Sequence, residues 1–216
     1  MRRWLKLGIL LVLATLTYEL FPKLLPQDVV WSGFGGEVVI FLQHNISTPV
    51  LDWAMFVIYS VGYVIIIYGT GGYLLWRRDY DRFACYLTVF FVVQSLGVFT
   101  WAVYPVAPPR IALENEVRDI RSELGQFTES FNPYPYGAFP SLHVANALTG
   151  VLFMRDYGKK EKWTWIFIFL IMSFSTVYLG EHYWEDVAGG IFYSLIGYSS
   201  VAAFSRTNLG KKLFSM

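Results

Sequence analysis

Charged residues are scarce in this sequence: Asp, Glu, Lys and Arg make up 15% of its 216 residues. A soluble domain usually carries about 25%. Because so few side chains need water, the shortage argues against an ordinary soluble domain and indicates long segments that are buried or face lipid. The formal net charge is +1, so no strong overall field attracts nucleic acid, and we expect no nucleic-acid partner.

Cysteine is almost absent, since Cys85 is the one thiol, and histidine occurs only three times. A single cysteine excludes an intrachain disulfide and a cysteine-based zinc site. With so few histidines, we expect no metal ion and no other cofactor. A metal enzyme is therefore a weak hypothesis, although five side chains are plausible ligands: His143, Glu181, His182, Glu185 and Asp186.

Apolar residues are abundant instead, at 55% of the chain. A membrane-spanning helix needs about 20 mostly apolar residues. The sequence therefore predicts an all-α, polytopic membrane helix bundle of about six transmembrane helices, forming a single domain over residues 1–216. We expect the first span to remain as an anchor, because no good cleavage site follows it. The predicted spans run from about Leu5 to Leu20, Val50 to Trp76, Phe83 to Tyr104, Leu142 to Met154, Trp163 to Gly180 and Val187 to Phe204.

Basic residues are distributed unevenly along this pattern. Thirteen of the seventeen fall in four segments: Arg2 to Lys6, Arg77 to Arg82, Arg155 to Lys162 and Arg206 to Lys212. Positive charge is retained on the cytoplasmic side of a membrane. The sequence therefore predicts that both termini are cytoplasmic and that the remaining connections are extracytoplasmic.

The two long outer segments each contain a further predicted helix. Glu37 to His44 is expected to form a short interfacial helix. Between Pro105 and Pro140, apolar residues recur every three or four positions, which predicts one amphipathic helix. Its polar face is acidic, so we expect an outer lid that rests on protein rather than on the membrane surface, with a simple spacer as an equal alternative. The apolar stripe is Leu113, Val117, Ile120, Leu124, Phe127 and Phe131.

Polar and charged residues gather in three clusters at the outer ends of the predicted spans. The clusters are Tyr104 to Arg110, Gly137 to His143, and Ser175 to Asp186. They are far apart in the sequence, yet the predicted topology places all three on the outer face, close to one membrane level. We therefore expect them to form one extracytoplasmic site.

The second and first clusters suit an anion. Pro140 favours the first turn of a helix, and the free amides and dipole at a helix start attract negative charge. Ser141 adds a hydroxyl donor and His143 follows it, although Ser141 is equally suited to a simple helix cap. The planar fork of Arg110 fits phosphate oxygens, and the prolines before it stiffen its approach. A snorkelling interfacial arginine is the alternative.

The third cluster places His182 and Asp186 four residues apart, so both would share one face of a helix. A carboxylate that holds one ring nitrogen fixes the tautomer and leaves the other nitrogen to attack or to take a proton. An ion pair at a helix end is the alternative. Ionisable residues near a membrane are costly enough that a functional role is the default.

These clusters resemble the three signature motifs of the type-two phosphatidic acid phosphatase superfamily, and they look closest to its inositol phosphorylceramide synthase-like branch. The resemblance implies that His182 is a nucleophile forming a phosphohistidine, that Asp186 orients it, and that His143 gives a proton to the leaving alcohol. It also implies that Arg110, Ser141 and backbone amides around Leu142 hold the phosphoryl oxygens.

Three positions depart from the family pattern. Val103 stands where the first motif usually has Lys, and Thr176 stands where the third motif usually has Arg. Leu142 replaces the usual Gly before the second-motif His. The expected site therefore lacks two cations, which suits a phosphodiester with one negative charge better than a monoester with nearly two.

The leading functional hypothesis is a membrane-embedded lipid-phosphate phosphatase that acts through phosphohistidine on the extracytoplasmic face. The alternative enzyme is a lipid phosphotransferase, which passes the group from a phosphodiester donor to an alcohol. A non-enzymatic channel or transporter is a further alternative, but its ionisable residues would be expected near the bilayer midplane. The expected partners are a phosphorylated lipid and the bilayer itself, and nothing in the sequence indicates an oligomeric state.

Overall fold

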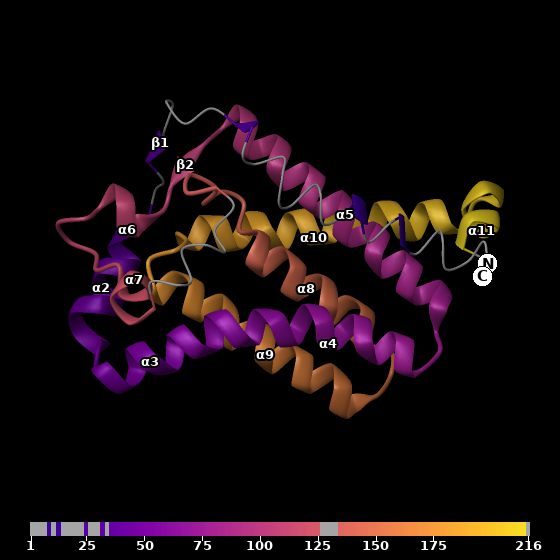
Figure 1. Cartoon of the computed structure of the whole chain (residues 1–216), viewed down its shortest axis with the longest axis horizontal. Coiled ribbons are helices and arrows are strands. Elements are labelled where there is room, and N and C mark those ends of the chain that lie inside the picture. The colour runs from indigo at the N-terminus through magenta and orange to yellow at the C-terminus, as the bar shows by residue number, and fades with distance from the viewer. Residues whose placement is uncertain are drawn as a thin grey trace.

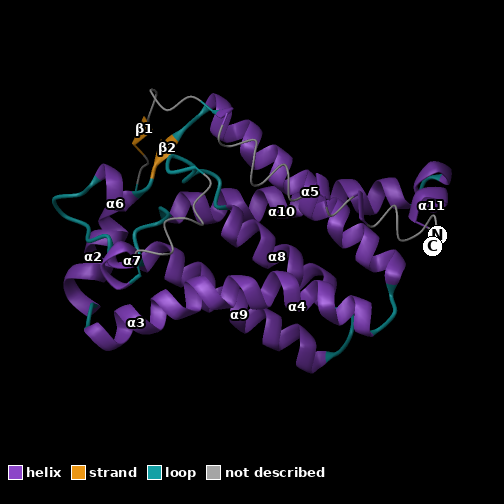
Figure 2. Cartoon of the chain, viewed as in Figure 1, coloured by secondary structure: helices purple, strands orange, loops and turns teal. Residues whose placement is uncertain are grey.

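The computed structural model describes residues 8–9, 12–13, 24–25, 31–32, 35–125 and 134–214. The first predicted span, Leu5 to Leu20, lies almost entirely outside these residues, as do Phe127 and Phe131 of the predicted lid. The described part is a bundle of helices with their long axes roughly along one direction (Figure 1). Its strands are limited to two pairs of residues (Figure 2). The all-α prediction is confirmed.

The five main helical segments match predicted spans two to six within a few residues. Among the described residues, three segments are long and apolar enough to cross a membrane: Pro49–Trp76, Tyr80–Val103 and Trp184–Ser205. The segments are α3 (Pro49–Val57), which continues through the π-helical η2 (Ile58–Gly62) into α4 (Tyr63–Trp76), then α5 (Tyr80–Val103), α8 (Leu142–Met154), α9 (Lys159–Tyr178) and α10 (Trp184–Ser205).

Helix α8 is the centre of the bundle. It packs against α4, α5, α9 and α10, and nearly all of its residues are buried. Its thirteen residues span about 20 Å, less than the roughly 30 Å apolar thickness of a bilayer. Because protein surrounds it, α8 does not need the length of a lipid-facing helix. Its first turn therefore lies inside the bundle and faces protein.

Two glycines allow the neighbouring helices to approach the start of α8. A Cβ on Gly190 of α10 would lie 2.4 Å from the carbonyl oxygen of Ser141. A Cβ on Gly97 of α5 would lie 2.5 Å from a methyl group of Leu142. Small residues at such contacts let membrane helices pack closely. The position of α8 therefore depends on glycines from both sides.

The two ends of the bundle differ (Figure 1). One end carries α2 (Gly36–Ile46), α6 (Pro109–Ala112), α7 (Ile120–Leu124) and the parallel pair β1 (Trp31–Ser32) and β2 (Val106–Ala107). The other end carries the α4–α5 and α8–α9 turns and α11 (Asn208–Phe214). The basic segments that the structure describes thus lie together at the end opposite α2, α6 and α7.

The predicted lid is correct in its burial and wrong in its shape. Val117 and Ile120 are 3% and 0% exposed, so the apolar stripe does rest on protein. The described part of the lid is not one helix, however. The chain turns after α6, and Asp119 then caps α7 by accepting a hydrogen bond from Ser122 N. Asp competes for local backbone donors and favours such a cap over a helix interior, so α7 starts anew at Ile120 and ends before Gly125.

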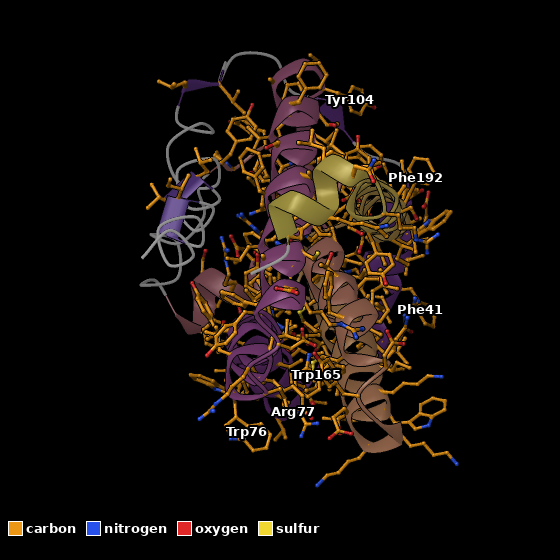
Figure 3. All side chains as sticks on the ribbon, turned by 90° about the vertical axis from the view of Figure 1, so that its right-hand side faces the viewer. Phe41, Trp76, Arg77, Tyr104, Trp165 and Phe192 are labelled. Carbon is orange, nitrogen blue, oxygen red and sulfur yellow. The ribbon has the colours of Figure 1, made fainter. Side chains whose placement is uncertain are left out.

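The sides of the bundle are apolar. Phe192 and Trp76 are 60% and 72% exposed, and both point away from the bundle (Figure 3). A soluble protein rarely leaves so many large apolar side chains in water. This surface is consistent with helices that face lipid.

The close contact at Gly190 is open to a direct test. Gly190→Ala would force a methyl group against Ser141, and we expect it to destabilise the bundle by about 1–3 kcal/mol. Gly72→Ala is the matched control, because a Cβ there meets nothing within 4 Å. Thermal unfolding in detergent should show a lower midpoint for Gly190→Ala only. Equal midpoints for the two variants would contradict the packing described here.

Candidate active site

Backbone hydrogen bonds join the three sequence clusters. Val106 N donates to Tyr136 O over 2.8 Å, and Ala138 N donates to Val106 O over 3.1 Å. These bonds hold the first cluster against the second. Ser141 N donates to Asp186 O over 3.0 Å and holds the second against the third.

The first and third clusters meet at Gly180. Arg110 N donates to Gly180 O over 3.0 Å. Gly180 has a φ of 74°, in the left-handed region that favours glycine. A Cβ there would also lie 2.9 Å from Val117 and 3.3 Å from Cβ of Arg110. Glycine thus allows both the turn after α9 and the close approach of the lid.

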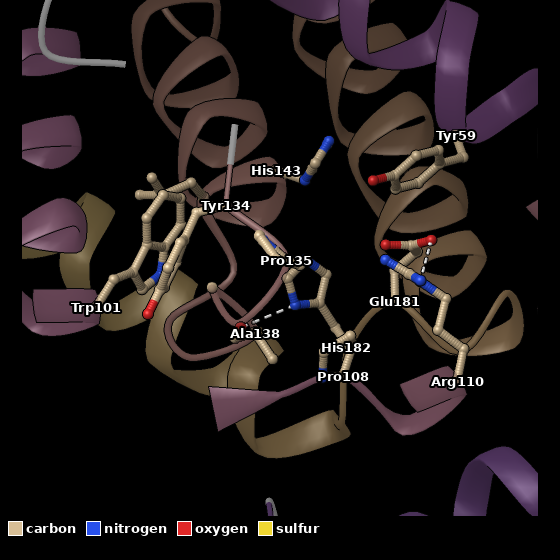
Figure 4. A pocket seen from close by; sticks show the side chains of 12 residues that line it. Tyr59, Trp101, Pro108, Arg110, Tyr134, Pro135, Ala138, His143, Glu181 and His182 are labelled. Atoms are coloured by element: carbon tan, nitrogen blue, oxygen red, sulfur yellow. Dashed lines mark hydrogen bonds and ion pairs between the residues drawn. The ribbon is translucent and has the colours of Figure 1, made fainter. Parts of the chain in front are cut away.

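A small cavity lies where the clusters meet (Figure 4). Its volume is about 40 Å³, far below the roughly 300–1,000 Å³ of pockets that enclose drug-sized ligands. The cavity as it stands is too small to enclose a whole lipid headgroup. The lining residues that carry the argument below are Tyr59, Arg110, Leu142, His143, Glu181 and His182.

His182 lies in the turn before α10, with its side chain 7% exposed. Its Nδ1 is 2.8 Å from the carbonyl oxygen of Ala138. A carbonyl can only accept, so Nδ1 carries a proton, and in the neutral form of the ring the lone pair is then on Nε2. The second ring nitrogen points toward His143 (Figure 4). The tautomer suits a nucleophile.

Asp186 stands behind His182 rather than in the cavity lining. Its Oδ2 is 3.6 Å from Nδ1 of His182, which is beyond hydrogen-bond distance. The same oxygen accepts a hydrogen bond of 2.7 Å from Tyr183 N, at the start of α10. In this structure the Ala138 carbonyl therefore sets the tautomer, and Asp186 adds negative charge close to the ring.

His143 lies in the first turn of α8, and its ring centroid is 5.9 Å from that of His182. The rings of Tyr59 and Tyr63 lie 4.7 Å and 4.3 Å from it. Tyr63 in turn accepts a hydrogen bond of 3.0 Å from Asn146. Two aromatic rings thus orient His143 toward the cavity.

Ser141 and Leu142 are placed differently from each other. Ser141 is fully buried and caps α8 by accepting from Val144 N over 3.4 Å, and its side chain is not among those that line the cavity. Leu142 does line it, and its side chain fills the space left by Gly97 of α5. The change from the family's usual Gly at position 142 is thus matched by a glycine on the facing helix.

Arg110 lies in α6, and from here on the segment from α6 to α7 is called the lid. The Arg110 side chain lines the cavity and is 8% exposed. Its Nη1 is 3.1 Å from Asp119 Oδ2, and its Nε is 2.9 Å from Glu181 Oε1. Arg121 of α7 also contacts Glu181 Oε1, over 3.0 Å. In the sequence, Arg121 is one of four basic residues outside the four basic segments, with Lys23, Arg110 and Arg118, and neither its neighbours nor its spacing marks it as part of the site.

Burial acts to lower the pKa of the Arg121 guanidinium, but the charges of Glu181 and Asp119 and the Tyr59 hydroxyl outweigh it and raise the pKa above its usual value. Arg121 is therefore charged at every working pH.

His44, the third histidine of the sequence, does not line the cavity. His44 is exposed on α2, and its Nε2 lies 3.0 Å from Glu116 O. Within the described ranges, the structure contains no group of three or more His, Cys, Asp or Glu side chains placed to hold a metal ion.

Comparison with known proteins adds a family and two relatives. The chain is 25% identical over 157 residues to the inositol phosphorylceramide synthase catalytic subunit of Schizosaccharomyces pombe. This match covers 64% of this chain and 35% of the relative. It is 38% identical over 60 residues to the inositol phosphorylceramide synthase of Candida albicans, and this match covers 28% of this chain and 13% of the relative. The chain thus matches well under two thirds of either relative's length.

No solved structure matches the chain. A model of the PAP2 superfamily matches residues 31–200, a range that contains all three clusters and the cavity between them. The chain therefore belongs to the PAP2 superfamily, whose members include membrane enzymes that hydrolyse or transfer lipid phosphate groups.

Proposed function

We propose that this protein transfers a phosphoryl group from a phosphorylated lipid through a covalent intermediate on His182. The observation that carries the proposal is the cavity in which His182, with Nδ1 held by Ala138, faces His143 beside Arg110. Phosphoryl transfer depends mainly on positioning and charge stabilisation. A neutral histidine, a second histidine and a guanidinium around one small space supply both.

In the first step, Nε2 of His182 attacks phosphorus. The N–P bond forms as the bond between phosphorus and the lipid oxygen breaks, and protonated His143 gives its proton to that leaving oxygen. General acid assistance of this kind typically contributes about 10²–10⁴ in rate. Arg110 and the free amides at the start of α8 stabilise the charge on the phosphoryl oxygens.

In the second step, neutral His143 removes a proton from the acceptor. The acceptor oxygen attacks phosphorus, the N–P bond breaks, and Nε2 of His182 regains its lone pair. Water as acceptor makes the protein a phosphatase, and an alcohol makes it a phosphotransferase. The residues perform the same steps in both cases.

This assignment predicts how the histidines differ. His182→Ala and His143→Ala should each lower kcat/KM for a phospholipid substrate by about 10²-fold or more, and the double variant should be little worse than His182→Ala alone. His44→Ala is the matched control and should retain near-normal turnover, because His44 lies outside the cavity. Purified variants in detergent give the measurement. Near-normal turnover by His182→Ala would contradict the assignment of His182 as the nucleophile.

We further propose that the cavity end of the bundle is extracytoplasmic and that both termini are cytoplasmic. The support is the grouping of described basic segments at the opposite end, since positive charge is retained in the cytoplasm. The substrate headgroup would then lie in the outer leaflet.

Thiol labelling tests this orientation in a Cys85→Ala background. Asn115 is an exposed residue of the lid, and Lys160 is an exposed residue in the first turn of α9. Each is replaced by Cys. An impermeant thiol reagent added to intact cells should label the first and not the second. Labelling of Lys160→Cys alone would invert the orientation.

A phosphotransferase that uses a phosphodiester donor is the second candidate, and Glu181 favours it. This carboxylate lines the cavity, and Asp119 contacts Arg110 from the other side. Arg110 and Arg121 therefore face two acids, and the four groups together carry no net charge. A site without surplus positive charge suits a singly charged diester better than a monoester with nearly two charges.

Donor preference separates the two candidates. For a phosphotransferase, kcat/KM should be higher with phosphatidylinositol than with phosphatidic acid, and an added lipid alcohol should accept the group; ceramide is the choice suggested by the relatives' names. Product analysis of the two donors, with and without ceramide, gives the answer. A strong preference for phosphatidic acid, with water as the sole acceptor, would contradict the phosphotransferase and support the phosphatase.

A further inference from the structure

A second arginine, Arg121, contacts the cavity lining without being part of it. The side chain of Arg121, on α7, is 5% exposed. Its Nε lies 3.0 Å from Oε1 of Glu181, the same oxygen that lies 2.9 Å from Nε of Arg110. Glu181 lines the cavity. One carboxylate thus holds two guanidinium groups, one from each short helix of the lid.

The three atoms of this contact have unused hydrogen-bonding capacity. Nε of Arg110, Nε of Arg121 and Oε1 of Glu181 are buried, and no described residue gives any of them a hydrogen bond of regular geometry. The two N–H groups are close to the carboxylate without pointing at it. Buried donors of this kind are costly unless an acceptor is supplied. An anion that binds beside Arg110 would supply one.

The negative charge of Glu181 also has to be balanced if the cavity is to bind a phosphate, and Arg121 balances it. A carboxylate in the lining of a phosphate site repels the substrate. Without Arg121, the single charge of Arg110 would face both Glu181 and Asp119, leaving one net negative charge. With Arg121 the charges of the four groups balance, so the lining no longer carries a net negative charge that repels the phosphoryl group.

The positions at which the family usually places its other cations give no charge here. Val103 is 63% exposed at the end of α5. Thr176 is fully buried, and its hydroxyl donates to Ser173 O over 2.8 Å. The lid supplies an alternative cation, Arg121, in contact with Glu181 of the lining.

We propose that Arg121 supplies the second positive charge of the phosphate site, acting through Glu181 in place of the cations missing at Val103 and Thr176. The proposal rests on the proposed function, because it takes the cavity to bind a phosphoryl group. Arg121 is a positioning residue, since it acts through Glu181 and Tyr59. Because α7 carries it, the site has its full charge only when the lid is in place.

Orthovanadate, which resembles a phosphoryl group, is the probe. Arg121→Gln should raise the vanadate concentration for half-inhibition by about tenfold or more, as expected for one uncompensated charge near the anion. Arg121→Lys keeps the charge and should recover most of the affinity. The double variant Arg121→Gln/Glu181→Gln removes the carboxylate as well and should return toward the wild type. Unchanged inhibition of Arg121→Gln, or a double variant no better than Arg121→Gln, would overturn the proposal.

Arg118→Gln is the matched control on the same lid. The Arg118 side chain is 50% exposed and contacts Asp52 and Glu123, and it does not line the cavity. We expect its half-inhibition to change by less than about threefold, because its pair with Glu123 is exposed and neither Asp52 nor Glu123 lines the cavity. An effect as large as that of Arg121→Gln would assign the loss to a loosened lid and contradict the role of Arg121.

Binding can be read without turnover. Vanadate should raise the thermal unfolding midpoint of the wild-type protein in detergent, and this rise should be lost in Arg121→Gln and retained in Arg121→Lys. If the rise in the midpoint depends on Arg121 but the wild-type protein turns over no phospholipid, the proposed function is contradicted and the inference is kept. If the protein turns over phospholipid but the rise does not depend on Arg121, the inference is contradicted and the proposed function is kept.

Discussion

Oε1 of Glu181 lies 2.9 Å from Nε of Arg110 and 3.0 Å from Nε of Arg121, and the site depends on this shared contact. It ties α6 and α7 of the lid to the turn between α9 and α10, which also carries His182. All three side chains are almost fully buried. Removing one partner from such a contact typically costs about 3–5 kcal/mol, because a charge is left buried without compensation. The lid is thus held by charge over the centre of the proposed chemistry.

The helix bundle supplies the frame in which this contact can form. α8 lies at the centre, so its first turn faces protein rather than lipid, and Gly190 and Gly97 let α10 and α5 close around it. The backbone bond from Ser141 to Asp186 then fixes the start of α8 beside the start of α10. His143 and His182 face each other because these two helix starts are joined.

Much of this arrangement could be predicted from the sequence. Long apolar runs fix five of the spans within a few residues, and topology alone predicts that the three clusters meet at one end. The single lid helix was wrong, because the period of apolar residues indicates burial and does not reveal the new start at Asp119. The contact of Arg121 with Glu181 could not be predicted either, since it joins residues 60 positions apart through a turn that depends on Gly180.

The central claim is that phosphorus becomes bonded to His182 during turnover, and trapping that bond tests it most directly. The protein is mixed briefly with radiolabelled phosphatidylinositol or phosphatidic acid and quenched in alkali, in which a phosphohistidine survives. The account predicts label on the peptide that contains His182, absent from His182→Ala and unaffected in His44→Ala. Turnover without any label on that peptide, or label that persists in His182→Ala, would contradict it.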